Sequence, residues 1–184
     1  MGEMRLVILD RDGVINQDSD AFIKSAEEWV ALAGSIDAIS RLSRGGFEVA
    51  VASNQSGLGR GLFSRQHLHA MHRKLRRAVT TNGGRLGKIV VCPHAPDAGC
   101  DCRKPGPGLL LRLGRLYNTS LRGVPVIGDS LRDLQAAVAV GARPILVLTG
   151  KGKETRAALN AADINAEVFR DLSAAATHLL NEAQ

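Results

Sequence analysis

Five short apolar runs, separated by segments of helical periodicity, constrain the fold more than any other feature of the sequence. The runs cover residues 6–9, 47–52, 88–91, 124–127 and 144–148. Continuous apolar runs of this length are typical of strands that are buried on both faces. Strands that alternate with helices form parallel sheets with helices on both sides. The sequence therefore predicts an α/β fold with a doubly wound, mostly parallel, Rossmann-like sheet in a single domain over residues 1–184.

The segments between these runs carry apolar residues three or four positions apart. We expect helices over residues 35–42, 64–79, 109–116, 130–140 and 171–180, with Ser64 as an N-cap. Two segments, residues 14–33 and 93–105, do not fit the alternation. Long excursions after the strands of such a sheet fall at its ligand-binding edge, and these two are too short to form a large cap domain.

The overall composition limits the kind of partner. No stretch approaches the about 18 apolar residues of a membrane span, and no apolar run near the start precedes a cleavage site. We therefore expect a cytoplasmic protein without a membrane partner. The net charge of +6 suits either nucleic acid or an anionic substrate. The densest basic stretch, residues 73–77, has a helical pattern that favours a solvated helix face, so we expect no nucleic-acid partner. Nothing in the sequence demands more than a monomer, which we take as the expected state.

Acidic residues follow two of the predicted strands. Asp10 and Asp12 come directly after the first strand, and Asp129 follows the fourth. Burying unpaired carboxylates is costly, and Mg²⁺, which prefers oxygen ligands, would relieve their repulsion. A turn with two solvated acids is the alternative explanation for the first pair. Asp133 lies in the first turn of the next helix, where a carboxylate favours the helix dipole, so we assign it a supporting role.

Hydrogen-bond donors and cations follow at the same edge. Ser53, Asn54 and Gln55 end the second strand, and Arg103 and Lys104 precede a predicted helix. A hydroxyl, two amides and two cations can bind phosphate oxygens and balance the carboxylates. A polar loop that caps a helix would explain the first three residues equally well.

The glycine-rich segment over residues 57–61 lacks the Lys-Ser/Thr pair of a P-loop. We expect a flexible turn that carries Arg60 toward the substrate.

Three cysteines and a histidine lie within eleven positions: Cys92, His94, Cys100 and Cys102. An odd number of cysteines is a poor disulfide framework, whereas these four ligands suit a closed tetrahedral zinc site. We expect a structural zinc ion in a loop insertion over residues 92–104, which would position Arg103 and Lys104. Incidental free thiols are the alternative.

A second group of histidines, His67, His69 and His72, does not share one helix face. We interpret these three residues as part of a surface helix rather than a metal site.

Four motifs occur in the order found in the haloacid dehalogenase-like phosphatases, which the chain resembles over residues 5–150. They are Asp10-x-Asp12-Gly13, Ser53, Lys104-Pro105 and Gly128-Asp129-x3-Asp133. Position 53 is Ser where many relatives have Thr, which keeps the hydroxyl. Within this superfamily, Asp10-Arg11-Asp12-Gly13 and Cys100-Asp101-Cys102-Arg103-Lys104-Pro105 resemble the bacterial heptose bisphosphate 7-phosphatases. The histidinol-phosphate phosphatases share the first motif and the metal loop, and they are the alternative.

The resemblance implies a magnesium-dependent phosphomonoester hydrolase. In such an enzyme Asp10 attacks phosphorus and Asp12 acts as general acid and then as general base. Magnesium is held by Asp10, the backbone carbonyl of Asp12 and Asp129, while Ser53 and Lys104 hold the phosphoryl oxygens. The implied reaction removes the 7-phosphate of D-glycero-D-manno-heptose 1,7-bisphosphate during synthesis of the ADP-heptose precursor of lipopolysaccharide core.

The substrate-binding residues expected beside these are Asn54, Gln55, Arg60 and Arg103. Two other classes compete with the hydrolase. A noncatalytic protein that binds phosphate or nucleic acid has no use for Asp10, which repels phosphate without a metal. A mutase uses the same aspartyl-phosphate but shields it from water under a sizeable cap.

Overall fold

A parallel six-stranded sheet forms the centre of the computed structural model, which describes residues 4–183. The strands are β1 (Arg5–Leu9), β2 (Phe47–Asn54), β3 (Ile89–Cys92), β4 (Pro125–Gly128), β5 (Arg143–Val147) and β6 (Glu167–Phe169). They pair in the order β3-β2-β1-β4-β5-β6, and every pair is parallel. The first strand, β1, therefore lies in the middle of the sheet, with later strands added on both sides of it. This order puts the switch point between β1 and β4, where open α/β sheets bind ligands.

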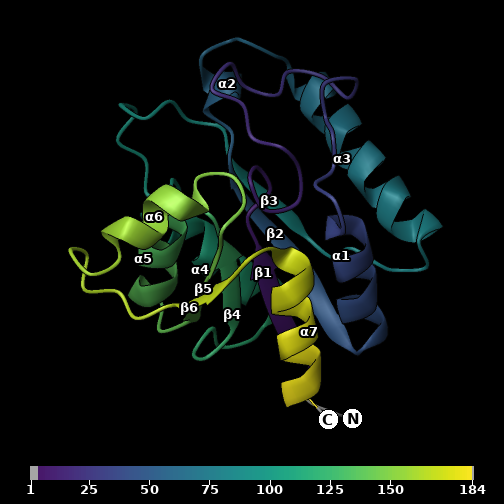
Figure 1. Ribbon diagram of the computed structural model, residues 1–184. Helices are drawn as coiled ribbons and strands as arrows, with labels where there is room; N and C mark the ends of the chain where they lie inside the picture. The colour runs from purple at the N-terminus through teal and green to yellow at the C-terminus, as the bar shows by residue number, and fades with distance from the viewer. Residues whose placement is uncertain (1–3, 184) are drawn as a thin grey trace.

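Helices cover both faces of the sheet, as the sequence predicted (Figure 1). They are α1 (Ser35–Arg44), α2 (Ser56–Gly59), α3 (Arg65–Thr81), α4 (Gly108–Tyr117), α5 (Leu131–Ala139), α6 (Gly152–Ala158) and α7 (Leu172–Glu182). Buried residues of α1, α3 and α7 form one core with the sheet, and buried residues of α4 and α5 form another on the opposite face. None of the helices in the described part of the chain could cross a membrane.

The central strand β1 explains why its sequence is continuously apolar. Successive side chains of a strand point to opposite faces. Val7 and Leu9 are buried in the core beneath α1 and α7, while Leu6 and Ile8 are buried beneath α4. Because water reaches neither face along residues 6–9, each of these positions requires an apolar side chain, which confirms the prediction of a doubly covered sheet.

The sequence predicted the longer elements well and missed three short ones. Every predicted strand and helix exists with its ends within two residues of the expected positions. Ser64 caps α3, with its hydroxyl accepting a hydrogen bond from the His67 amide, as expected. The missed elements, α2, α6 and β6, are four, seven and three residues long. Elements this short hold too few residues to establish a hydrophobic period.

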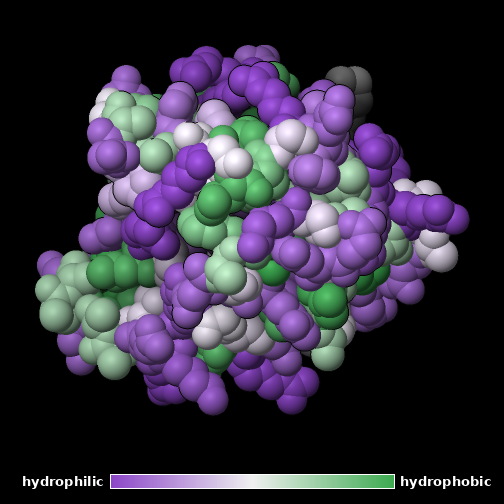
Figure 2. Space-filling view, turned by 90° about the horizontal axis from the view of Figure 1, so that it is seen from above, coloured by the Kyte–Doolittle hydropathy of each residue, from purple (hydrophilic) through white to green (hydrophobic). Residues whose placement is uncertain are grey.

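The two irregular excursions lie together at the carboxyl edge of the sheet. Both the segment after β1 and the segment after β3 contribute residues to the same pocket, as expected for this sheet type. Figure 2 views this end of the molecule from above, where hydrophilic residues predominate and apolar residues show near the centre and at the left edge. The basic stretch at residues 73–77 lies on α3 with only Leu75 buried, which confirms the solvated helix face.

Candidate active site

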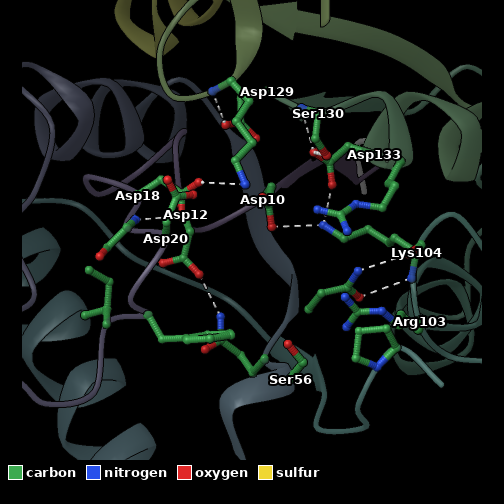
Figure 3. A pocket seen from close by; sticks show the side chains of 18 of the residues that line it. Asp10, Asp12, Asp18, Asp20, Ser56, Arg103, Lys104, Asp129, Ser130 and Asp133 are labelled. Atoms are coloured by element: carbon green, nitrogen blue, oxygen red, sulfur yellow. Dashed lines mark hydrogen bonds and ion pairs between the residues drawn. The ribbon is translucent and has the colours of Figure 1, made fainter. Parts of the chain in front are cut away.

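A pocket of about 290 Å³ opens at the carboxyl ends of β1 and β4 (Figure 3). Its lining is dominated by charged side chains of both signs. These are Asp10, Asp12, Asp18, Asp20, Arg60, Arg103, Lys104, Asp129, Arg132, Asp133 and Lys151. The structure therefore brings together most of the site residues that the sequence singled out, from segments that are far apart in the chain.

Three carboxylates form the floor of this pocket. One oxygen each from Asp10, Asp129 and Asp133 lies within 4.8 Å of the other two. Burial, together with the nearby Asp133 charge, raises the pKa of Asp10 to about 8 and that of Asp129 to about 7. This crowding of buried negative charge is relieved by a cation, and an all-oxygen donor set fits a hard divalent ion such as Mg²⁺.

Gly13 leaves room for the Asp129 side chain beside the end of β1. It has a φ of +83°, and a Cβ atom there would lie 2.0 Å from Asp129 Oδ2. A larger residue at position 13 would push Asp129 away from the other two carboxylates of the pocket floor. The glycine of the first motif is therefore required by packing as well as by backbone conformation.

Lys104 is the cation between these carboxylates. Its Nζ lies 2.9 Å from Asp10 Oδ1 and 2.6 Å from Asp133 Oδ1, and it donates a hydrogen bond of 2.7 Å to the Ala52 carbonyl. Figure 3 shows Lys104 between the two acids. Although burial opposes the charge on this lysine, Asp10 and Asp133 raise its pKa. Lys104 is thus a charged ammonium in a pocket where only 3% of its surface is exposed.

Asp133 differs from Asp10 although both contact Lys104. Burial alone would raise the pKa of Asp133, but Lys104 and hydrogen bonds from Ser130 lower it. The Ser130 amide and hydroxyl donate to Asp133 Oδ2 at 3.1 and 2.6 Å. Both oxygens of Asp133 therefore have donors inside the protein, a geometry that agrees with the expected supporting role.

Asn54 and Arg103 flank Lys104 in different ways. The Asn54 side chain accepts a hydrogen bond of 3.1 Å from the Lys104 amide and donates one of 3.0 Å to its carbonyl. Asn54 therefore ties the segment after β3 to the end of β2, and both of its side-chain polar groups have partners there. Arg103 lines both this pocket and a smaller hollow of about 240 Å³ beside it, together with Arg132.

Asp12 lies outside the three-carboxylate floor, in a cage of hydrogen-bond donors formed by Arg11, Asn16 and Gln55. Gln55 also donates a hydrogen bond of 2.7 Å to Ser53 Oγ. Ser53 is 1% exposed and is not among the residues lining the pocket. Asp12 and Gln55 do line the pocket, as the sequence predicted, but the structure also pairs them with each other, and Gln55 with the buried Ser53.

The loop after β5 closes one side of the site, a role that was not predicted from the sequence. The Lys151 amide donates a hydrogen bond of 2.8 Å to Asp129 Oδ2, and its Nζ lies 3.5 Å from Asp18 Oδ2. The Thr149 hydroxyl donates to the Gly13 carbonyl at 2.6 Å. Its position could have been predicted, because the carboxyl ends of all strands in a parallel sheet lie at the same edge, and this loop follows β5.

Arg60 reaches the pocket from the end of α2, as expected of the glycine-rich segment. Its guanidinium carbon lies 5.8 Å from the centre of the Phe22 ring. Phe22 belongs to the excursion after β1 and has a φ of +65°. Asp18, Asp20 and Ser56 also line the pocket and were not predicted, since nothing in their local sequence separates them from ordinary loop residues.

The cysteine cluster lies in the excursion after β3. Cys92 Sγ is 3.6 Å from Cys100 Sγ and 3.6 Å from His94 Nδ1, and Cys102 Sγ is 3.6 Å from Cys100 Sγ and 3.2 Å from His94 Nδ1. Zinc–sulfur bonds of about 2.3 Å correspond to tetrahedron edges of about 3.8 Å, close to these spacings. Burial raises the pKa of Cys102 to about 12, helped by the other two sulfur atoms. All three cysteines are free thiols, so the donor set fits one tetrahedral metal ion.

The three histidines of α3 have different surroundings. His67 and His69 are exposed, as expected for a surface helix. His72 is turned inward, where burial and the Arg11 charge lower its pKa to about 4. The helix is a surface helix, as predicted, and His72 lies on the face that it turns toward the buried Arg11. None of the three belongs to a group of metal-binding side chains in the described residues.

Known proteins resemble this chain along nearly its whole length. A family model described as "HAD-hyrolase-like" matches residues 101–175. The D-glycero-beta-D-manno-heptose-1,7-bisphosphate 7-phosphatase of Pseudomonas putida is 54% identical over 96% of this chain and 100% of its own length. The protein of that name from Bordetella bronchiseptica is 53% identical over 98% of this chain and 100% of its own.

Solved structures agree with these sequence matches. A D,D-heptose 1,7-bisphosphate phosphatase from B. bronchiseptica, crystallised with magnesium and phosphate, superposes with a TM-score of 0.93 at 52% identity and covers 97% of this chain and 99% of that one. The corresponding enzyme from Burkholderia thailandensis has a TM-score of 0.74 at 44% identity, over 96% and 98% of the two chains. The chain therefore belongs to the D-glycero-beta-D-manno-heptose-1,7-bisphosphate 7-phosphatase family of haloacid dehalogenase-like hydrolases.

Proposed function

We propose that this chain is a magnesium-dependent phosphatase that removes the 7-phosphate of D-glycero-beta-D-manno-heptose 1,7-bisphosphate, on the way to the ADP-heptose precursor of lipopolysaccharide core. One observation carries the proposal. The carboxylates of Asp10 and Asp129 meet Lys104 in a single pocket at the switch point of the sheet. Relatives that share more than half of the residues over nearly the whole chain carry this name.

The chemistry that these residues support has two steps. An oxygen of Asp10 attacks phosphorus, and the bond from phosphorus to the sugar oxygen breaks as that oxygen takes a proton from Asp12. A water molecule then attacks the aspartyl-phosphate and gives its proton to Asp12. The bond to Asp10 breaks, its electron pair returns to the Asp10 carboxylate, and inorganic phosphate leaves.

The metal site fits this chemistry. Asp10, the backbone carbonyl of Asp12 and Asp129 would hold Mg²⁺, which would supply positive charge beside the phosphoryl oxygens. Lys104 adds a fixed ammonium group 2.9 Å from Asp10 Oδ1. Because Gln55 donates to the Ser53 oxygen, the Ser53 hydroxyl keeps its own proton for a phosphoryl oxygen. Such fixed donors stabilise a phosphoryl transition state mainly by electrostatics.

A second metal belongs to the proposal. Cys92, His94, Cys100 and Cys102 would hold one structural zinc ion, since four ligands leave no open position. The ion would order a loop insertion over residues 92–104 and thereby hold Arg103 and Lys104 in the pocket. The whole chain, residues 1–184, would then act as one phosphatase domain.

The remaining substrate contacts follow from the charges of the pocket. Arg60 and Arg103 lie on its rim and would bind the rest of the phosphorylated sugar. Three free thiols close together suit a reducing compartment, which supports the cytoplasm as the location. We propose a monomer, with no nucleic-acid or membrane partner.

The test is a comparison of two substrates with and without metal. Purified protein is assayed on the heptose bisphosphate and on histidinol phosphate, and phosphorus NMR identifies which phosphate is released. We expect release of the 7-phosphate, dependence on magnesium and a large preference for the heptose. Equal or faster turnover of histidinol phosphate would move the chain to the alternative specificity, and metal-independent turnover would contradict the site.

A further inference from the structure

We propose that Arg11 is a positioning residue for the reaction. Its buried guanidinium, together with Gln55 and Asn16, holds the Asp12 carboxylate in the orientation that proton transfer needs. This inference rests on the proposed function, because it takes Asp12 to be the general acid and base. Sequence reasoning gave Arg11 no task of its own.

The contact between Arg11 and Asp12 is bidentate. Arg11 Nε donates to Asp12 Oδ1 at 3.0 Å, and the NH2 group donates to Oδ1 at 2.9 Å and to Oδ2 at 3.1 Å. Two parallel charge-assisted hydrogen bonds fix the plane and the direction of a carboxylate, which a single ammonium group does not do. The pair therefore sets an orientation as well as balancing a charge.

Arg11 is itself fixed in place. It is 1% exposed, its NH2 group donates to Gln55 Oε1 at 3.0 Å, and its NH1 group lies 4.0 Å from the Met71 sulfur on α3. Among the ion pairs of the described residues, its acidic partner is Asp12. Because these contacts hold the buried guanidinium in one position, the Asp12 carboxylate bonded to it is also restricted to one orientation.

Two amides complete the cage. Asn16 Nδ2 donates to Asp12 Oδ1 at 2.8 Å, and Gln55 Nε2 donates to Oδ2 at 2.8 Å. The Gln55 amide group also reaches Ser53, so one side chain joins Arg11, Asp12 and the end of β2. Both polar groups of Gln55 are occupied within this cage, which argues for positioning rather than for the substrate contact expected from the sequence.

Asp12 keeps an open side toward the pocket. Its side chain is 22% exposed and lines the cavity, while Arg11 behind it is buried. Proton transfer to a leaving oxygen requires a short and well-directed contact. Misplacement of a reacting group by about 1 Å can cost roughly a hundredfold in rate. Loss of the cage should therefore slow the steps that use Asp12 and spare the attack by Asp10.

Two substrates separate these steps. The heptose oxygen leaves only with a proton, whereas p-nitrophenolate leaves without one. With enzyme in excess over p-nitrophenyl phosphate, the rate of p-nitrophenol release reports the attack by Asp10 alone. Hydrolysis of the resulting aspartyl-phosphate again needs Asp12, and acid quenching followed by mass spectrometry measures how much phosphorylated protein accumulates.

The variants are Arg11→Met, Arg11→Lys and Gln55→Leu, with Arg143→Met as a matched control. Arg143 is also an arginine paired with acids, Glu167 and Glu182, but at the far edge of the sheet. For Arg11→Met we expect kcat on the heptose bisphosphate to fall about a hundredfold. Single-turnover release of p-nitrophenol should change by no more than about threefold, because no proton is transferred to that leaving group. Phosphorylated protein should accumulate.

The companion variants keep the test decisive if Arg11→Met does not fold. Arg11→Lys keeps the charge but not the bidentate geometry, and Gln55→Leu removes one donor without leaving a buried charge unpaired. Both should show the same selective loss at a smaller magnitude, while Arg143→Met lowers stability and leaves the ratio of the two rates unchanged.

Two results would overturn the inference. Equal losses in both assays would mean that Arg11 supports the pocket in general, and unchanged rates would mean that Asp12 needs no cage. Failure of the proposed function is a separate outcome, because it shows in the wild-type protein itself, which would then either form no phosphorylated Asp10 or fail to turn over the heptose bisphosphate.

Discussion

The two ligand clusters of this protein are built in opposite ways. The carboxylate cluster of Asp10, Asp129 and Asp133 joins the ends of two strands that are distant in sequence and adjacent in the sheet. The thiol cluster of residues 92–102 is drawn from one short segment of chain. The first exists only once the sheet has formed, whereas the second needs little more than a local loop.

The two clusters also differ in the kind of metal ion that their ligands suit. The carboxylate cluster contains a lysine counter-charge and opens to a pocket, so it suits a weakly held ion that shares its ligands with substrate. The thiol cluster offers four borderline or soft ligands at the spacing of a closed tetrahedron, which suits a tightly held ion without open positions. We therefore propose that one cluster serves the reaction and that the other holds a loop.

Removing the nucleophile should have the largest effect and should be confined to the carboxylate cluster. Asp10→Asn keeps the shape of the side chain but cannot attack phosphorus, so kcat should fall on the order of a millionfold. Zinc content and melting temperature should stay near those of the wild type. Enzyme kinetics with elemental analysis measures both, and substantial activity in pure variant protein would remove Asp10 from its role.

Removing magnesium should have the second-largest effect. Loss of a charge that stabilises the transition state by several kcal/mol corresponds to about a thousandfold in rate. Brief chelation should stop turnover and added Mg²⁺ should restore it, with zinc still bound. Asp129→Ala should raise the magnesium concentration needed for half-maximal activity. Full activity after chelation, verified by elemental analysis, would contradict the distinction between the two sites.

Disrupting the thiol cluster should have a smaller effect on rate and a clear effect on stability. Cys100→Ser should lower zinc content from about one ion per chain, loosen the loop and shift Lys104, at a cost of roughly a hundredfold in rate. The melting temperature should fall because metal binding is coupled to ordering the loop. Asp101→Asn, at the exposed neighbouring position, is the control. Zinc-free protein with full activity and unchanged melting would show the thiols to be incidental.

The smallest expected effect concerns the buried surroundings of Arg11, outside both clusters. Burial and the Arg11 charge lower the pKa of His72 from 6.5 to about 4. The folded state therefore binds this proton less readily than the unfolded chain does. The contribution of His72 to stability is present above pH 6.5 and is lost as the pH falls toward 4.

Replacing this histidine should remove that part of the acid sensitivity. His72→Leu should flatten the fall in unfolding free energy between pH 6.5 and 4 by about 2 kcal/mol, whereas His69→Leu, at an exposed position, should not. Urea denaturation at several pH values measures the difference. An unchanged slope in His72→Leu would show that His72 titrates normally.

Much of the site was predictable because its residues belong to strand ends that the sequence marks clearly. Asp10, Asp129 and Lys104 were expected at one edge, and the structure brings them together there. The strand ends follow from apolar runs, and in a parallel sheet all carboxyl ends share one edge. The thiol cluster was predictable for a simpler reason, since its ligands are neighbours in the chain.

The sequence by itself determined the layers of the fold, the edge at which charge gathers and the local thiol cluster. Apolar periodicity and short-range spacing both act within one segment, so they can be seen without knowing which segments meet. The tertiary structure alone decided that Asn54 holds the backbone of Lys104, that Asp133 shares this lysine with Asp10, and that Arg11 and Gln55 surround Asp12. These contacts depend on strand order and on side-chain direction. Both are set only when distant segments pack against one another and each buried charge must find a partner.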